Sequence, residues 1–314
     1  MSLPPFERAA IEFYHSRQAW DAASVEILQT MLHRWSLTSG TIFRGGYSAT
    51  VMAVTDADGV PAVLKVAFPH PEALAEAVAL EAFPVGTAPR ILRLDPWSWT
   101  MLLERVLPGT SLAEHPASVD ETIVAGATLL ARLQESALPE GIPTLAHTVS
   151  GFVAGVQSHS ADVRQLGAGK LVADALDDAA NLLASDARPP VLIHGDFNPG
   201  NILRSHDGWI AIDPKPMSGD GAWDLWPLVS QLGSVGRHGP TAIELRRRME
   251  LATRVAGLDT ARSIRWARFR AALTICWYLG ERDTRRAEAE ISSLESWTSA
   301  VRSLSCDGQR SDSL

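Results

Sequence analysis

Three polar residues that could carry out chemistry lie close together in the second half of the chain. Asp196 and Asn201 are separated by four residues in the segment HGDFNPGN, and Asp213 follows Asn201 by twelve positions. All three flank short apolar runs, so two carboxylates and one carboxamide should meet at the mouth of a small sheet. Oxygen ligands of this type suit Mg²⁺, which keeps one or two protein ligands beside phosphate oxygens. We therefore predict that Asn201 and Asp213 bind Mg²⁺ and that Asp196 accepts a proton from an attacking hydroxyl group.

A lysine interrupts an apolar segment in the first third of the chain. The 28 basic residues include only three lysines, and one of them, Lys65, lies in the run VLKV. A charge inside an apolar strand is unfavourable unless an opposite charge neutralises it. Glu76, eleven residues later in an alanine-rich segment that favours helix, is the predicted partner, and Glu72 and Glu81 are the alternatives.

Two adjacent glycines lie between predicted strands in the segment GGYS. Gly45, Gly46 and Ser48 could bring backbone N–H groups close to phosphate oxygens, although a turn in any hairpin would look similar. A second glycine-rich segment ends at Lys170 and resembles the end of a P-loop, but it lacks two defining residues of that motif. Arg164 replaces the first glycine, and Leu171 replaces the serine or threonine that would bind magnesium. Lys170 is therefore expected on the solvated surface.

The segments that must position these residues differ between the two parts of the chain. Residues 1–105 are predicted to form a leading helix followed by elements in the order β-β-α-β-β. The expected helices are residues 21–35 and 71–83, and the expected strands are residues 41–54, 61–66, 91–94 and 100–105.

The chain becomes mostly helical after a break at residues 107–109. Ser118 and Glu121 have the spacing of a capping box at the start of a helix. Further helices are expected at residues 150–165, 168–185, 241–256, 261–280 and 284–303, and short strands at residues 191–193, 201–203 and 209–212. The small, polar tail from about residue 305 is expected to be disordered.

Composition narrows the class of protein. The formal net charge of −8 argues against binding nucleic acid over a broad surface. The two cysteines form no CxxC pair, so a disulfide framework is not expected and a reducing cytoplasm fits best. No segment has the length and hydrophobicity of a membrane span, and the charged first 30 residues do not resemble a signal peptide. We therefore expect a cytoplasmic protein that binds neither nucleic acid nor membrane.

The chain resembles the aminoglycoside phosphotransferases, which share the protein-kinase fold. The D-x-x-x-x-N spacing of the catalytic loop is present, with HGD in place of the HRD of protein kinases. The branch of aminoglycoside/hydroxyurea antibiotic resistance kinases, which contains streptomycin 6-kinases and hydroxyurea phosphotransferases, is similar in further motifs. These are WSL at 35–37, DGVPAVLK at 58–65, TMLLER at 100–105, IDPK at 212–215 and GDGAWDL at 219–225.

The resemblance implies an α+β, bilobal protein-kinase-like fold. A small β-rich nucleotide-binding lobe would comprise residues 1–105, and a helical lobe with the catalytic loop and the acceptor site would comprise residues 106–314. Lys65 would bind the α- and β-phosphates and be oriented by Glu76, while adenine would lie against residues 103–107. The implied cofactors are Mg²⁺ and ATP, with GTP not excluded.

The implied activity is transfer of the γ-phosphate of a nucleoside triphosphate to a hydroxyl group of a streptomycin-like antibiotic. Two rival interpretations remain open. The first is the same reaction on another small acceptor, such as hydroxyurea, a peptide antibiotic or an amino alcohol. The second is a nucleotide-binding pseudokinase without turnover, which is disfavoured because every member of the set Lys65, Asp196, Asn201 and Asp213 is present. The sequence does not decide between a monomer and a dimer.

Several further residues have predicted supporting roles. His194 should hold the loop by hydrogen bonds, and Asp224 should cap a helix or anchor the backbone of the catalytic loop. Lys215 could touch phosphate or acceptor, or could pair with Asp220.

Three larger groups of residues are predicted to lie outside the reacting centre or at its edge. Trp223, Trp226, Trp266 and Trp277 are expected in the core. The eleven arginines and five acidic residues of segment 241–286 give it a charge of +6, and it should form a solvated face. That charge argues mildly against a polycationic acceptor, although an acidic cleft could come from Asp174, Asp177 and Asp178.

Overall fold

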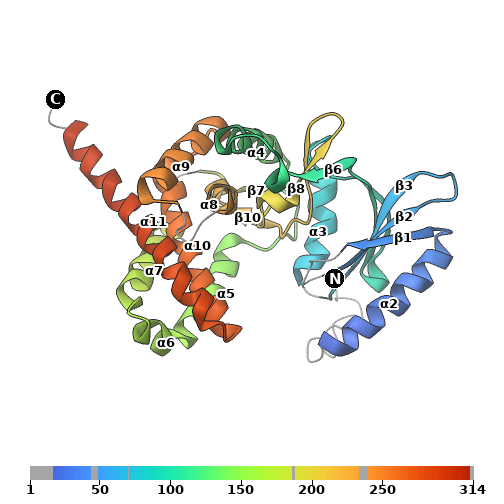
Figure 1. Cartoon of the computed structure of the whole chain (residues 1–314), viewed down its shortest axis with the longest axis horizontal. Coiled ribbons are helices and arrows are strands. Elements are labelled where there is room, and N and C mark those ends of the chain that lie inside the picture. The colour runs from blue at the N-terminus through green and yellow to red at the C-terminus, as the bar shows by residue number, and fades with distance from the viewer. Residues whose placement is uncertain (1–16, 44–48, 70, 186–187, 233–239, 312–314) are drawn as a thin grey trace.

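A computed structural model describes residues 17–43, 49–69, 71–185, 188–232 and 240–311. The first part is a sheet with two helices, and most of the remainder is helical (Figure 1). The first part contains helix α2 (Arg17–Arg34), strands β1 (Thr38–Phe43), β2 (Ala49–Thr55) and β3 (Pro61–Ala67), helix α3 (Pro71–Ala82), and strands β4 (Ile91–Asp95) and β5 (Thr100–Glu104).

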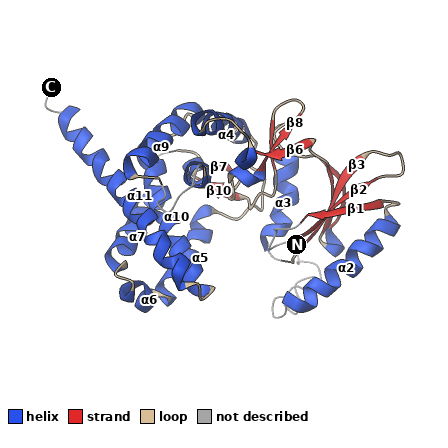
Figure 2. Ribbon diagram, in the orientation of Figure 1, coloured by secondary structure: helices blue, strands red, loops and turns tan. Residues whose placement is uncertain are grey.

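The second part combines short strands with long helices, as the colours of Figure 2 show. Its strands are β6 (Pro108–Ser111), β7 (Val191–Ile193), β8 (Ile202–Ser205), β9 (Trp209–Ala211) and β10 (Met217–Gly219). Its helices are α4 (Val119–Leu133), α5 (Leu145–Ser158), α6 (Ser160–Gln165), α7 (Gly169–Ala184), α8 (Leu225–Gln231), α9 (Ala242–Ala256), α10 (Thr260–Gly280) and α11 (Thr284–Ser311). No helix in the described part of the chain is long and apolar enough to cross a membrane.

The five-stranded sheet positions Lys65 by the alternation of its side chains. The strands are antiparallel in the order β1-β2-β3-β5-β4, and Lys65 on β3 lies opposite Val51 and Met101. Its neighbours Leu64 and Val66 pack in a buried cluster with residues of α2. Because successive side chains of a strand point to opposite faces, Lys65 faces the other side, where it bonds Glu76 of α3. Figure 1 shows α3 and α2 beside the sheet.

Most elements of the first part agree with the sequence-based prediction. The leading helix, the helix at 71–83 and the strands at 61–66, 91–94 and 100–105 are all present within a few residues. The segment 41–54, which GGYS interrupts, was counted as a single strand in the predicted order, but it contains parts of β1 and β2, which pair with each other through Phe43 and Val51. The order of elements after α2 is therefore β-β-β-α-β-β. The sheet ends at Glu104, next to the predicted lobe boundary at residue 105, which stays a prediction.

The strands around the catalytic segment belong to two sheets rather than to one. β7 pairs with β10, whereas β8 pairs with β9 and with β6. The difference arises because β10, which the sequence analysis did not predict, takes the position beside β7. Asp196 and Asp213 are consequently held by different sheets.

The helical part begins as predicted but ends differently. Ser118 and Glu121 form the expected capping box at the start of α4, with each side chain bonded to the other residue's backbone N–H group. Helix α11 continues to Ser311, so the chain is helical over most of the tail that was expected to be disordered from about residue 305. Its buried Leu294 and Trp297 anchor the helix in the core, and an anchored helix extends readily because each further residue adds one hydrogen bond.

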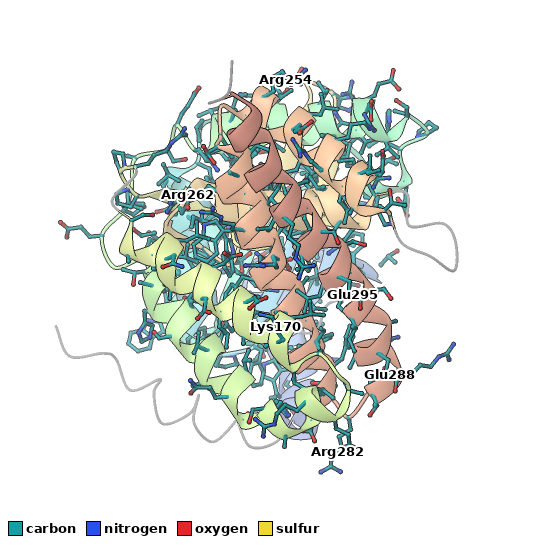
Figure 3. The ribbon with its side chains drawn as sticks, turned by 90° about the vertical axis from the view of Figure 1, so that its left-hand side faces the viewer. Lys170, Arg254, Arg262, Arg282, Glu288 and Glu295 are labelled. Carbon is teal, nitrogen blue, oxygen red and sulfur yellow. The ribbon has the colours of Figure 1, made fainter. Side chains whose placement is uncertain are left out.

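The solvated face expected for the arginines of segment 241–286 is confirmed only in part. Six of the eleven are exposed, namely Arg247, Arg254, Arg265, Arg282, Arg285 and Arg286. Arg248 and Arg268 are buried, with 6% and 8% of their surfaces exposed. Arg248 donates to the carbonyl oxygen of Leu232 at 2.7 Å, and Arg268 on α10 forms an ion pair with Asp178 on α7. Their long apolar stems can be buried while the guanidinium groups meet oxygen atoms. Arg254 remains on the outer surface of the helical part (Figure 3).

The Arg268–Asp178 pair should stabilise the packing of α10 on α7. Replacing Arg268 with Met leaves the carboxylate of Asp178, whose side chain is 13% exposed, without its partner. We expect the free energy of unfolding to fall by about 3 kcal/mol, the size found when one member of a buried pair is removed. Denaturation in urea measures the change.

Lys170→Met provides the matched control for this measurement. The side chain of Lys170 is 82% exposed on α7 and pairs with Asp174 at 2.9 Å (Figure 3). A surface pair contributes at most about 1 kcal/mol, so the control should be close to wild type. Equal losses in the two variants would contradict the interpretation of Arg268.

Candidate active site

A buried lysine joins the sheet-rich part of the chain to the helical part. The Nζ atom of Lys65 on β3 lies 2.5 Å from Oε1 of Glu76 on α3 and 2.6 Å from Oδ1 of Asp213, which follows β9. The structure therefore pairs Lys65 with Glu76, while Glu81 is exposed. The side chain of Glu72 lies outside the described residues. Asp213 has a positive φ of 56°, a backbone conformation that aspartate adopts more readily than most residues.

The charges of this cluster stabilise one another. Burial alone would lower the pKa of Lys65, but the carboxylates of Glu76 and Asp213 outweigh it and raise that pKa above its ordinary value. Burial alone would raise the pKa of Asp213, but the ammonium group of Lys65 holds it below its ordinary value. Lys65 and Asp213 are thus both charged at neutral pH.

Asp196 lies in the loop after β7 with both carboxylate oxygens engaged. Asn198 Nδ2 donates to Oδ1 at 3.1 Å, and Lys215 Nζ donates to Oδ2 at 2.9 Å. Burial alone would raise the pKa of Asp196, but the ammonium group of Lys215 and the Asn198 amide hold it below its ordinary value. Asp196 is therefore ionised at neutral pH and can accept a proton.

Asn201 and Asp213 lie where they could share a divalent cation. The backbone N–H of Ile212 donates to the carbonyl oxygen of Asn201 at 2.9 Å, which links the two segments. Asn201 donates through Nδ2 to the carbonyl oxygen of Asp196 at 2.9 Å, so its Oδ1 remains for a ligand. Asp213 uses Oδ1 for Lys65 and retains Oδ2. The two remaining atoms are oxygen donors of the kind that Mg²⁺ prefers, so the residues present fit such an ion.

The start of the catalytic loop is anchored by a buried carboxylate. Oδ2 and Oδ1 of Asp224, which is completely buried, accept the backbone N–H groups of His194 and Gly195 at 2.7 and 2.8 Å. Asp224 makes no side-chain capping bond to α8, so of the two predicted roles it has that of the anchor. His194 holds the loop as expected, since its Nε2 is 3.1 Å from the carbonyl oxygen of Ile212 and its Nδ1 accepts the N–H of Asp196 at 3.3 Å.

The residue between His194 and Asp196 has to be glycine. Gly195 has a φ of 83°, and a Cβ atom there would lie 1.9 Å from the carbonyl oxygen of Lys215. The N–H of Lys215 in turn donates to the carbonyl oxygen of His194 at 2.7 Å. The segment after Asp213 thus packs directly on the catalytic loop, which explains why HGD replaces the HRD of protein kinases.

A cavity of about 610 Å³ opens beside Asp196 and Lys215, between α5 and α10. Most of its walls are apolar or aromatic side chains, contributed by Phe152, Val156, Met217, Trp223, Trp226, Leu273, Cys276 and Trp277. The ionisable groups on its walls, besides Cys276, are Asp196, Lys215, His159, Arg270 and Glu281. Its size is typical of a site for a small molecule.

The tryptophans divide between core and cavity. Trp223 and Trp266 are buried at 2% and 0% exposure, as predicted, although Trp223 also touches the cavity. Trp226 is partly buried and packs against the core. The prediction is wrong for Trp277, which is 54% exposed because it lies in the last turn of α10 at the rim of the cavity.

The sequence analysis did not identify two residues that contact the catalytic loop beside Asp196. Asn198 holds Asp196 and also caps a short 3₁₀ turn at Pro199–Asn201, for which the Asn-Pro dipeptide was an available signal. Arg270 donates to the carbonyl oxygen of Gly195 at 3.3 Å, with its guanidinium carbon 4.5 and 5.0 Å from the ring centroids of Trp223 and Trp226. Nothing local in the sequence separates Arg270 from the other arginines of its segment.

Some expected contacts are absent or lie outside the described residues. Lys215 pairs with Asp196 and not with Asp220, which instead bonds Arg262 and, at 2.6 Å, Trp266 Nε1. None of the three aspartates Asp174, Asp177 and Asp178 lines the cavity beside Asp196, so the acidic cleft proposed for them is wrong. They lie on α7, where Asp174 and Asp178 pair with basic residues. Gly45, Gly46 and Ser48 fall in the segment that the structure does not describe.

Burial should keep His194 uncharged at physiological pH. It lowers the pKa of His194 from 6.5 to about 4. We expect one of the nine histidines to show no titration between about pH 5.5 and 8 in proton NMR spectra, and this signal to be missing from His194→Gln. Because the folded pKa lies below the unfolded one, the stabilisation is present above pH 6.5 and is lost as the pH falls toward 4. Titration of His194 near pH 6.5 would contradict this assignment.

Comparison with known proteins agrees with this arrangement. The profile of the aminoglycoside/hydroxyurea antibiotic resistance kinase family matches residues 34–281. A hydroxyurea phosphotransferase from Kitasatospora aureofaciens is 34% identical, over 84% of this chain and 76% of that protein. A streptomycin 6-kinase from Streptomyces glaucescens is 32% identical, over 84% of this chain and 86% of that protein.

A solved structure shows the same fold at low sequence identity. It is a thermostable mutant of an aminoglycoside phosphotransferase in complex with ADP and hygromycin B, with a TM-score of 0.61 and 13% identity, covering 85% of this chain and 96% of that chain. The bilobal, protein-kinase-like α+β fold predicted from the sequence is thereby confirmed. From the family profile and the two relatives it follows that the chain belongs to the aminoglycoside/hydroxyurea antibiotic resistance kinase family.

Proposed function

We propose that the protein transfers the γ-phosphate of ATP to a hydroxyl group of a streptomycin-like aminoglycoside and so confers resistance to it. The observation that carries the proposal is that the Lys65–Asp213 ion pair lies close to Asp196, whose charge acts on Asp213 and which lines the cavity. A phosphate-binding ammonium group, an oxygen ligand for a metal and a proton acceptor are the parts that phosphoryl transfer requires. The streptomycin 6-kinase among the relatives supports the choice of acceptor.

The nucleotide would bind between the sheet and the catalytic loop. A kinase of this family uses a nucleotide and a divalent metal ion. We assign Lys65 to the α- and β-phosphates and Asn201 and Asp213 to Mg²⁺, which when bound would neutralise charge on the phosphates. Gly45, Gly46 and Ser48 would approach the phosphates, and residues 103–107 would contact adenine. ATP is the proposed donor, with GTP as the alternative.

Asp196 would take the proton of the acceptor. It is ionised at neutral pH and opens onto the cavity, so a hydroxyl group bound there can donate a hydrogen bond to its carboxylate. As the oxygen of that group bonds to phosphorus, the proton passes to Asp196 and later to solvent. Asn198 and the anchored backbone of Gly195 keep the carboxylate in place during the reaction.

The cavity favours an acceptor larger than hydroxyurea. Its volume of about 610 Å³ is within the range of sites for drug-sized ligands, and a molecule of a few atoms would leave most of it filled with water. Its aromatic walls suit the apolar faces of sugar rings. The exposed carboxylate of Glu281 suits a cationic substituent, while the cations Lys215 and Arg270 on the same walls are held by Asp196 and by tryptophan rings. These features support an aminoglycoside of the size of streptomycin, with hydroxyurea as the second candidate acceptor.

Asp196→Asn tests the role of the base. The variant keeps the size of the side chain but replaces one accepting oxygen with an NH2 group and removes its basicity, so we expect kcat to fall by a factor of about 10² to 10⁴. The rate of ADP formation with streptomycin measures the effect. Asp207→Asn, at an exposed aspartate on the turn between β8 and β9, is the matched control and should retain wild-type turnover. Wild-type turnover by Asp196→Asn would contradict the assignment.

A panel of acceptors tests the substrate. The wild-type protein is incubated with ATP, Mg²⁺ and one of streptomycin, hydroxyurea or ethanolamine, and the products are identified by phosphorus NMR. We expect a phosphate ester of streptomycin and no phosphorylated product from the other two. Product from hydroxyurea or ethanolamine alone would show that the acceptor is wrong. Nucleotide binding without any product would instead indicate a pseudokinase.

A further inference from the structure

Lys215 is the charged residue beside the reacting centre to which neither the fold nor the metal site gives a role. It is one of three lysines in the chain. Its backbone is fixed on both sides, because its N–H donates to the carbonyl oxygen of His194 and its own carbonyl oxygen packs against Gly195. Its side chain is 43% exposed and lines the cavity. The side chain thus extends from a fixed backbone position, and its ammonium group lies at the space where the acceptor would bind.

The two lysines of the site are held in different ways. Lys65 is buried at 7% side-chain exposure between two carboxylates, at 2.5 and 2.6 Å, and cannot leave them without exposing unpaired charges. Lys215 pairs with the carboxylate of Asp196 at 2.9 Å, and its side chain is 43% exposed and lines the cavity. Its charge also acts on Asp213, the residue that holds Lys65. Lys215 therefore lies close to both the proposed base and the proposed metal site and is the more exposed of the two cations.

Both oxygens of the base already have a hydrogen-bond donor, Asn198 on one and Lys215 on the other. A carboxylate oxygen can accept more than one hydrogen bond, but a hydroxyl group that approaches Asp196 from the cavity meets Lys215, which lines the same cavity, whereas Asn198 does not line it. The amide of Asn198 is fixed, because its Oδ1 also accepts the backbone N–H groups of Gly200 and Asn201. Lys215 is the partner that can give way.

We propose that Lys215 is a catalytic residue that moves from Asp196 to the transferring phosphoryl group. The inference rests on the proposed phosphotransferase function. When the acceptor binds, its hydroxyl group replaces the ammonium group at Oδ2 of Asp196, and the ammonium group donates to an oxygen of the γ-phosphoryl group. The acceptor oxygen then bonds to phosphorus, the bond from phosphorus to the β–γ bridging oxygen breaks, ADP leaves with that electron pair, and the proton goes to Asp196. Lys215 stabilises the charge on the phosphoryl group and shields it from the carboxylate.

Covalent labelling tests the position of Lys215 without relying on turnover. The probe is an acyl phosphate of ATP, whose acyl group is transferred to a lysine amine next to the terminal phosphate with release of ATP. Because the chain has three lysines, peptide mass spectrometry identifies the labelled residue directly. We expect acylation of Lys215 that excess ADP prevents, and none at Lys170, which is exposed on the outer face of α7 (Figure 3). Acylation of Lys65 without Lys215 would overturn the inference.

Kinetics of matched lysine variants test the catalytic role. In Lys215→Met we expect kcat with streptomycin to fall by a factor of about 10² to 10³, the usual effect of losing one preorganised donor. The dissociation constant of ADP, measured by calorimetry, should change by less than a factor of about three, because ADP lacks the γ-phosphoryl group. Lys170→Met should match wild type in both measurements. Unchanged kcat in Lys215→Met, or an equal loss of kcat and of ADP affinity, would show a structural role only and overturn the inference.

The wild-type protein separates this inference from the proposed function. If it phosphorylates streptomycin while Lys215→Met does so equally well, only the role of Lys215 is wrong. If the wild-type protein forms no product with any acceptor of the panel and ADP does not bind, both proposals are wrong.

Discussion

The charge cluster of Lys65, Glu76 and Asp213 is the interaction on which the rest of the site depends. It joins β3, α3 and the segment after β9, so it fixes the sheet-rich part of the chain relative to the catalytic loop. Removing one member of such a buried cluster typically costs about 3–5 kcal/mol, because a charge is left without a partner. Two carboxylates against one ammonium group also leave an excess negative charge. A divalent cation at Asp213 would offset that excess and turn the cluster into an attractive site for phosphate.

A second constraint acts through the backbone and keeps Asp196 in place before any substrate arrives. Asp224 accepts the backbone N–H groups of His194 and Gly195, and the N–H of Lys215 donates to the carbonyl oxygen of His194. These contacts leave no room for a side chain at Gly195. A base that is already oriented needs little rearrangement during the reaction, which is the main contribution that a protein makes to phosphoryl transfer. The cavity then has to orient the acceptor, and Lys215 only has to exchange one oxygen partner for another.

The sequence predicted the elements that follow from local patterns. The helices and the strands of the first sheet were predicted from periodicity, and the capping box of α4 was predicted from two residues. The partner of Lys65 was predicted because a charge in an apolar strand is rarely left unpaired. Long-range placement could not be predicted in this way. The pairing of β7 depends on β10, a three-residue strand, and the contact of Lys215 with Asp196 depends on the close approach of two backbones at Gly195. Neither leaves a periodic signal.

The arginine-rich segment shows why summed charge is a poor guide to the acceptor. Its charge of +6 is unfavourable for binding a polycationic antibiotic, yet Arg248 bonds the carbonyl oxygen of Leu232 and Arg268 forms an ion pair with Asp178. Ion pairs and buried contacts of this kind have little field at a distance, because opposite charges lie within a few ångströms and exposed ones are screened by salt. What a substrate meets is the local balance on the cavity walls. There Arg270 is partly covered by two tryptophan rings and Lys215 is paired with Asp196, whereas Glu281 is exposed at the rim, so the carboxylate of Glu281 is the charge that a cationic acceptor meets first.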